Sequence, residues 1–203
     1  MRSSADKYKS GVLIGGGAFG KVYQCKNFSN LCKKTHAKDK NEFLEAEAAI
    51  MRRLKEVADL LDCITIQVPN VPRIMSAFYE PDGCFSIVMT MLGPSVDQLY
   101  KEVCRGALSI ASVLKIGVQV VDVLAHMHAR SIIHNDIKPG RFACSVLIVQ
   151  GNMVMGNANS DEAAMVHLVD FGIAQEHEPE PERLDTPQDV MRLARSSKTL
   201  TII

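Results

Sequence analysis

The chain has 203 residues, of which 47% are hydrophobic, and its 23 basic residues balance its 23 acidic ones. This length suits one domain, or one domain and part of a second, with enough apolar residues for a core. A formal charge of zero provides no net attraction to nucleic acid or to an anionic membrane, so we expect neither as a partner.

The cysteines and the N-terminus point to an intracellular protein. The six cysteines show no C-x-x-C spacing and no histidine cluster, so we expect buried, reduced thiols rather than a zinc site or disulfides. The first residues are polar and unlike a signal peptide. The longest uncharged run, 142–160, is interrupted by polar residues and makes a poor membrane span. We therefore expect a cytoplasmic or nuclear location.

A glycine cluster interrupts the first strand-like segment, residues 11–26. Gly15, Gly17 and Gly20 form a G-x-G-x-x-G pattern, and residues 27–30 are expected to form the next turn. Because residues 21–25 are strand-like and do not begin a helix, we favour a hairpin whose backbone N–H groups face an anion over a Rossmann turn. A merely flexible glycine turn is the alternative.

Residues 41–61 show helical periodicity, with Asn41 as the expected N-cap. The predicted buried face consists of Phe43, Ile50, Leu54, Val57 and Leu61. Glu47 falls within this apolar stripe, where an unpaired carboxylate is costly, so a lysine on a neighbouring strand is its expected partner. Alternatively, Glu47 skirts the stripe and reaches water.

The rest of the chain mixes short strands with a second helix. A buried strand is predicted over 84–89, a helix over 109–129, and short strands over 132–134 and 166–169. The predicted buried face of the second helix consists of Val113, Gly117, Val120, Leu124 and Met127. The acidic, proline-bearing tail from Gln175 is expected to be mobile. This order of elements is typical of an α+β fold and not of regular βαβ units.

Two acidic motifs follow predicted strands. His134-Asn135-Asp136-Ile137-Lys138-Pro139 comes first, and Asp170-Phe171-Gly172 follows the strand at 166–169. Such a pair suits phosphoryl transfer, in which one aspartate accepts from a hydroxyl and the other holds magnesium on nucleotide phosphates. Asp-Phe-Gly alone is common by chance, but the order of the three motifs makes chance a poor explanation.

With these motifs, and with Leu92-Gly93-Pro94-Ser95, the chain resembles a eukaryotic protein kinase, most similar to the casein kinase 1 and tau-tubulin kinase group. The resemblance covers residues 8–175 and implies a bilobal α+β fold. A small lobe of about 8–92 would hold an antiparallel sheet and one helix, and about 93–175 would begin a mainly helical, truncated large lobe. Residues 176–203 would form an acidic tail.

The resemblance implies a serine/threonine kinase that uses ATP and Mg²⁺ and phosphorylates a Ser/Thr-containing protein substrate. The alternative is a kinase-like module that binds nucleotide or a partner without phosphate transfer. Retention of the lysine, the glutamate and both aspartates favours the kinase. The oligomeric state is left open.

The resemblance also implies roles for particular residues. Asp136 would be the catalytic base, Lys138 would contact the transferring phosphate, and Asp170 would bind magnesium. ATP contacts would come from Ile14, Gly15, Gly17, Gly20, Val22, Lys33, Glu47, Met89, Met91 and Leu92. Lys33, which lies 14 residues before Glu47, is the preferred strand lysine, with Lys34 and Lys38 as alternates.

Three departures from the family pattern stand out. Asn135 replaces the usual arginine, which removes the cation that reads a phosphorylated activation loop. Arg141 stands where the magnesium asparagine is expected, but deleting residues 140–150 yields H-N-D-I-K-P-G-N-M-V-M-G and places Asn152 there. We therefore expect Asn152 to be the displaced metal ligand, behind an insertion or an unspliced in-frame intron. Only 31 residues follow Gly172, without Ala-Pro-Glu, so the resemblance implies a further stretch of large lobe covering the 109–129 helix.

Overall fold

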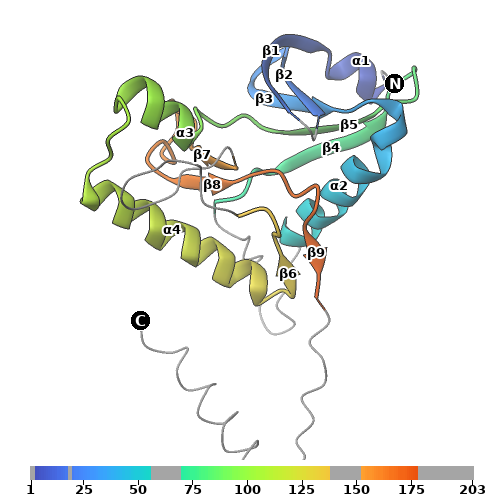
Figure 1. Cartoon of the computed structure of the whole chain (residues 1–203). Coiled ribbons are helices and arrows are strands. Elements are labelled where there is room, and N and C mark those ends of the chain that lie inside the picture. Colours follow the sequence, from blue (N-terminus) through green and yellow to red (C-terminus); the bar gives the residue numbers. More distant parts are fainter. Residues whose placement is uncertain (1–2, 18–19, 56–69, 138–151, 178–203) are drawn as a thin grey trace, which may run out of the picture.

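The computed structural model describes residues 3–17, 20–55, 70–137 and 152–177. Its largest element is a five-stranded antiparallel sheet in the order β1-β2-β3-β5-β4 (Figure 1). The strands are β1 (Ser10–Gly17), β2 (Gly20–Cys25), β3 (Phe28–Thr35), β4 (Ile74–Tyr79) and β5 (Phe85–Thr90), and the short helix α1 (Ser4–Lys7) precedes them. The predicted glycine hairpin is thus present as β1 and β2. The predicted turn over 27–30 is too long, because β3 already begins at Phe28.

Helix α2 (Asn41–Lys55), which follows a 3-10 turn at Lys38–Lys40, packs against β4 and β5. Its buried residues are Leu44, Glu47, Ala48, Ile50, Met51 and Leu54. The predicted face was wrong at Phe43, which is 51% exposed, because the stripe is centred on Leu44 and continues through Ala48 and Met51. Val57 and Leu61 lie outside the described residues.

Asn41 does not cap α2 as predicted; it ties the start of the helix to the turn between β4 and β5. Its side-chain Nδ2 donates to the Gly83 carbonyl at 2.9 Å, and its Oδ1 accepts from the Phe85 N–H at 2.8 Å. These two bonds satisfy backbone groups of the turn and fix where α2 begins relative to the sheet.

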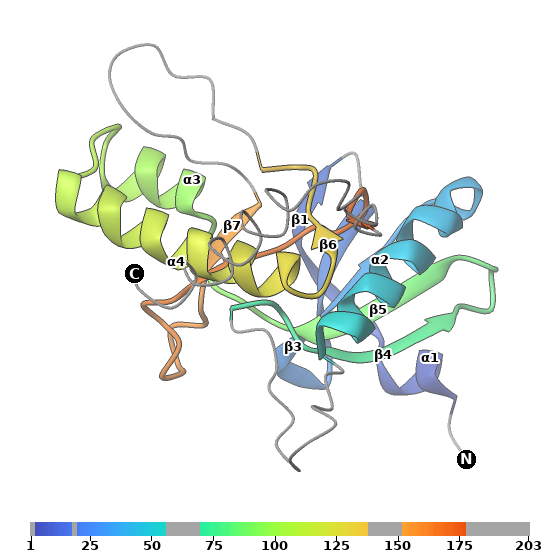
Figure 2. The same cartoon turned by 90° about the horizontal axis from the view of Figure 1, so that it is seen from below.

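The second half of the described chain is built around α4 (Ile110–His128), which lies within one residue of the predicted 109–129 helix at each end. Ser109 is its N-cap. Before it come α3 (Val96–Gln98) and a π turn (Leu99–Val103). After it come β6 (Ile132–Ile133), β7 (Met153–Met155), β8 (Val166–Leu168) and β9 (Gln175–Glu176), which pair as β6–β9 and β7–β8. The C-terminal ends of α2 and α4 converge near β6 (Figure 2).

The larger hydrophobic core of the described residues runs through both halves. It extends from Leu44 and Ile87 in the sheet half, through Phe171 and Leu168, to Met127 of α4, and all five are at most 1% exposed. The segment around Phe171 is therefore held between the halves by apolar burial. A smaller cluster on the other face of the sheet contains Tyr8, Cys25, Leu31 and Val88.

Helix α4 also has an apolar side that nothing among the described residues covers. Ile110, Leu114, Val118 and Val121 are 63–80% exposed, and their spacing places them on one face. By length and composition α4 is one helix that could cross a membrane, although core helices of soluble proteins pass the same test.

The expectation of a mobile tail from Gln175 was wrong at its start. Gln175 and Glu176 pair with Ile133 and Ile132, and the His177 N–H donates to the Ser131 carbonyl at 2.7 Å. Backbone pairing with β6 therefore outweighs the acidic composition at these positions. The remainder of the predicted tail, 178–203, lies outside the described residues.

Candidate active site

A cavity of about 450 Å³ lies between the sheet and the second half of the chain. Its lining includes the β1–β2 glycines, the end of β5 and the connection after it, and the segment that follows β8. Nine of the ten residues predicted to contact a nucleotide line this cavity: Ile14, Gly15, Gly17, Gly20, Val22, Glu47, Met89, Met91 and Leu92. The tenth, Lys33, does not.

The glycines of the hairpin are required for different reasons. Gly20 has φ +113, and a Cβ there would lie 2.6 Å from the Thr35 carbonyl oxygen, so the backbone itself requires glycine. A Cβ on Gly15 or Gly17 would meet nothing within 4 Å. These two glycines leave open space beside the cavity, where backbone can approach a ligand.

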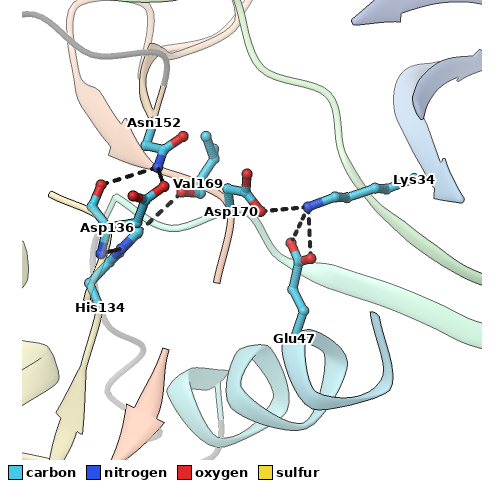
Figure 3. Close-up of polar contacts among 7 residues, drawn as sticks. All are labelled: Lys34, Glu47, His134, Asp136, Asn152, Val169 and Asp170. Atoms are coloured by element: carbon cyan, nitrogen blue, oxygen red, sulfur yellow. Dashed lines mark hydrogen bonds and ion pairs between the residues drawn. The ribbon is translucent and has the colours of Figure 1, made fainter. Parts of the chain in front are cut away.

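Lys34, Glu47 and Asp170 form the main charged group of the cavity (Figure 3). The Lys34 ammonium lies 2.9 and 2.7 Å from the two Glu47 carboxylate oxygens and 2.8 Å from Asp170 Oδ1. The β3 register explains this placement, since Lys34 pairs with Val22 and Ile87 and its side chain lies on the face that α2 covers. Glu47 is 2% exposed, as its position within the apolar stripe predicted.

The prediction that Lys33 pairs with Glu47 was wrong. Lys33 bonds Glu80 at 2.6 Å, and Glu80 also accepts from the Ser86 hydroxyl at 3.0 Å. Successive strand residues point to opposite faces, so a one-residue error in locating the strand lysine moves its ammonium across the sheet. Lys34, an alternate in the sequence reading, holds the expected place, and Lys38 lies in the 3-10 turn before α2.

The charged group has two carboxylates for one ammonium. Burial alone would lower the pKa of Lys34, but the neighbouring charges of Glu47 and Asp170 outweigh it and raise that pKa, so Lys34 stays charged. Burial raises the pKa of Glu47, and the negative charge of Asp170 adds to the effect of burial. A further cation beside Asp170 would relieve this excess of negative charge.

Asp136 and Asn152 are brought together although 15 residues separate them in the sequence. The Asn152 Nδ2 donates to Asp136 Oδ2 at 2.6 Å and to the Asp136 carbonyl at 3.2 Å (Figure 3). Asn152 is placed by β7, which begins at the next residue, and it also lines the cavity. Lys138, Arg141 and the predicted insertion 140–150 lie outside the described residues.

His134 orients the loop that carries Asp136. Its Nε2 lies 3.2 Å from the Val169 carbonyl, and the Asp136 N–H lies 3.4 Å from its Nδ1. A neutral ring protonated on Nε2 satisfies both contacts. Burial holds the pKa of His134 below its ordinary value of 6.5, which favours that neutral form. The sequence motif indicated His134, but only the fold shows that it connects the two aspartate loops.

The connection after β5 presents backbone groups to the cavity. The Met91 N–H already donates to the Asn30 carbonyl at 2.8 Å, and the Met91 carbonyl accepts from Asn157 at 3.4 Å. Among the described residues the Leu92 N–H has no partner, so it can serve a ligand. Sequence reasoning missed Asn157, because no local pattern marks an amide that reaches 66 residues back along the chain.

Cys32 also lines the cavity, and its thiol lies 3.7 Å from the Thr90 carbonyl. Burial raises the pKa of Cys32 to about 12, so the thiol stays protonated and inert near neutral pH. Of the described cysteines, Cys25 and Cys32 are buried, as expected, whereas Cys84 and Cys104 are partly exposed.

The donor set suits a magnesium–nucleotide complex. Within the described part of the chain, no group of three or more His, Cys, Asp or Glu side chains could hold a metal ion. Mg²⁺ is commonly bound by one or two protein oxygens together with substrate phosphates. The carboxylate of Asp170 and the amide oxygen of Asn152 are oxygen groups of the kind that Mg²⁺ prefers, and Lys34 is a cation suited to phosphates.

The comparison with protein families agrees with this geometry. The chain matches the protein kinase domain family over residues 8–192, and it therefore belongs to the protein kinase family. The expected bilobal kinase fold, with an antiparallel small-lobe sheet and one helix, is confirmed.

Individual relatives place the chain near casein kinase 1. It is 28% identical over 171 residues to casein kinase I homolog 1 of Saccharomyces cerevisiae, covering 84% of this chain and 28% of that protein. It is 27% identical over 176 residues to casein kinase I homolog 2 of the same yeast, again covering 84% and 28%. A probable serine/threonine-protein kinase of Dictyostelium discoideum is 28% identical over 166 residues, covering 80% and 29%.

The predicted similarity to the casein kinase 1 group is therefore confirmed. The chain spans less than a third of the length of these relatives.

Proposed function

We propose that the chain is a serine/threonine protein kinase that transfers the γ-phosphate of ATP to a protein hydroxyl. The observation that carries this proposal is the meeting of two groups at one cavity. Lys34, Glu47 and Asp170 form one group in the cavity. Asn152, which also lines the cavity, holds Asp136 by a hydrogen bond and so forms the second group (Figure 3). Phosphoryl transfer depends mainly on positioning and on electrostatic stabilisation, and this arrangement provides both.

Lys34 would bind phosphate oxygens while Glu47 holds its ammonium in place. Asp170 and Asn152 would hold Mg²⁺, which when bound neutralises charge on the phosphates. The raised pKa of Lys34 keeps its side chain protonated, so its ammonium can attract the negatively charged phosphates. The Leu92 N–H is the candidate donor to the nucleotide base.

Asp136 would act as the base. The bond from the substrate oxygen to the γ-phosphorus forms, the bond from that phosphorus to the bridging oxygen breaks, and ADP leaves. The hydroxyl proton passes to the Asp136 carboxylate, which Asn152 and the His134 contact to the Asp136 N–H keep in position. Lys138, two residues further along, would contact the transferring phosphate.

The partners we propose are ATP and a Ser/Thr-containing protein. The zero formal charge supports the absence of a nucleic-acid or membrane partner. A cytoplasmic or nuclear location fits the reduced cysteines.

A second candidate is a kinase-like module that binds nucleotide without transferring phosphate. The observation that favours it is the spacing of 16 positions between Asp136 and Asn152, which interrupts the loop that must place the base. A base displaced by about 1 Å loses much of its effect, whereas nucleotide binding through Lys34 and Asp170 would survive.

Transfer of labelled γ-phosphate from ATP to casein by the full chain tests the proposal. We expect magnesium-dependent labelling that falls by roughly 10²- to 10⁴-fold in Asp136→Asn, because general-base catalysis is lost. Asp161→Asn is the matched control, since Asp161 is exposed in the turn between β7 and β8. Labelling that Asp136→Asn leaves unchanged would belong to another enzyme. Nucleotide binding without any labelling would establish the second candidate.

A further inference from the structure

We propose that Asn135 is a positioning residue that holds the metal-binding aspartate in place through a neutral hydrogen bond. This inference rests on the proposed function, because it takes Asp170 as the magnesium ligand. Asn135 stands at the position where the sequence departs from the usual arginine.

The contact joins the catalytic loop to the segment that follows Asp170. The Asn135 Nδ2 donates to the Ile173 carbonyl at 3.1 Å. The preceding residue, His134, contacts the Val169 carbonyl at 3.2 Å. Two consecutive loop residues therefore hold the carbonyls on either side of Asp170-Phe171-Gly172.

The backbone makes both ends of this contact sensitive to the side chain. Asn135 has φ 63 and Asp170 has φ 68, so both lie in the left-handed region. Asn and Asp are the non-glycine residues that visit this region most readily, because their short polar side chains bond locally. A bend of this kind persists only when surrounding contacts determine it. The Asn135 amide makes one such contact, and its acceptor, the Ile173 carbonyl, lies three residues after Asp170.

Further contacts join the two segments after Ile173. The His177 N–H donates to the Ser131 carbonyl at 2.7 Å, and β9 pairs with β6. Residues 131–135 thus contact several positions within 169–177, and Ile173, the partner of Asn135, lies between the strand pairing at 175–176 and the His134 contact at Val169. Loss of the amide would remove the contact on the C-terminal side that lies nearest to Asp170 in the sequence.

The amide of Asn135 differs from the guanidinium of an arginine in its charge and in the partner that it requires. It carries no charge, so it requires no phosphorylated partner, and its hydrogen bond to a carbonyl is little affected by salt. The contact from Asn135 to the segment after Asp170 therefore needs no phosphorylated side chain.

The test compares two substitutions in the full chain. Asn135→Gly keeps the left-handed backbone and removes the amide, whereas Asn135→Asp keeps the shape and turns an oxygen toward the Ile173 carbonyl. Asn159→Gly and Asn159→Asp, in the exposed turn between β7 and β8, are the matched controls.

Two readouts distinguish positioning from general stability. Hydrogen–deuterium exchange of residues 170–177 in nucleotide-free protein should accelerate roughly three- to tenfold in both Asn135 variants, as loss of about one hydrogen bond implies. The gain in ATP affinity on adding Mg²⁺ should shrink by a similar factor, roughly three- to tenfold, while affinity for ATP without metal stays constant.

Exchange at residues 170–177 equal to wild type would overturn the inference, as would faster exchange with an unchanged magnesium gain. If wild-type protein binds no ATP at all, the proposed function fails instead. The exchange measurement then decides alone whether Asn135 positions this segment.

Discussion

His134 is a buried residue whose charge state affects the stability of the fold. It bridges the loop of Asp136 and the strand before Asp170, and burial holds its pKa below 6.5. The unfolded chain therefore takes up, near pH 6.5, a proton that the folded chain binds only at a lower pH. The stability that His134 contributes is fully present above pH 6.5 and is lost as the pH falls below that value.

We predict that the stability cost of His134→Gln, measured by urea unfolding, shrinks at low pH. Between about pH 7.5 and about pH 5.5 the cost should fall by about 1 kcal/mol, because glutamine does not titrate and one proton changes stability by at most ~1.4 kcal/mol per pH unit. His128→Gln, at an exposed position of α4, is the control for the loss of a histidine side chain as such. A cost for His134→Gln that is constant across this range would contradict the assignment of a neutral buried ring.

Nine of the ten residues predicted to contact the nucleotide line the cavity, but the preferred strand lysine was the wrong one. Asp136, Asp170 and Glu47 could be read from motifs and from one buried helix position, because each has a local signature. Lys33 and Lys34 are adjacent and chemically identical, and only the register of β3 between β2 and β5 decides which faces Glu47. Asn152 was predicted as a displaced metal ligand from the family pattern that remains when residues 140–150 are deleted. The structure places its amide 2.6 Å from Asp136, and the metal role itself stays a prediction.

At the scale of elements, α2 and β9 are joined by an ion pair between Arg53 and Glu176. Both side chains are about half exposed, and β9 is only two residues long. This contact links the helix that carries Glu47 to the strand that follows Asp170. It was not predicted, since the tail from Gln175 was expected to be mobile and the pairing with β6 is non-local.

We predict a small, salt-sensitive coupling between these two residues. A double-mutant cycle with Arg53→Gln and Glu176→Gln should give about 0.2–1 kcal/mol at low salt in unfolding experiments, and less at ~1 M salt. Arg52→Gln, at the neighbouring exposed position on α2, should show no coupling to Glu176→Gln. Equal coupling for both arginines would show that net charge, and not this contact, is responsible.

At the scale of the whole molecule, α4 has one side in the core and one side bare. Met127 is fully buried against the shared core, whereas Leu114 and Val118 are 63% and 69% exposed. The two long helices were predictable from periodicity, because apolar spacing is a local property. How α2 is rotated was not, since Ala48 and Met51 compete with Phe43 for the core and only packing decides.

We predict that substitution on the buried side of α4 lowers the stability of the protein much more than substitution on the exposed side. Met127→Ala should cost about 2–5 kcal/mol of unfolding free energy, whereas Leu114→Ala should stay within about 0.5 kcal/mol of wild type. The pair Leu114→Lys and Val118→Lys should reduce concentration-dependent self-association in light scattering, because a bare apolar patch promotes it. Destabilisation by Leu114→Ala comparable to that by Met127→Ala would contradict the described packing of α4.

The most direct test of the central claim is calorimetric titration of Mg-ATP into the full chain and its Lys34→Met and Lys33→Met variants. The two lysines are neighbours of equal charge, but only Lys34 lies in the cavity with Glu47 and Asp170. The account predicts binding by wild type, a loss of at least about tenfold in affinity for Lys34→Met, as expected for a charge-assisted phosphate contact, and unchanged affinity for folded Lys33→Met. The opposite order of the two variants, or binding that neither substitution weakens, would contradict it.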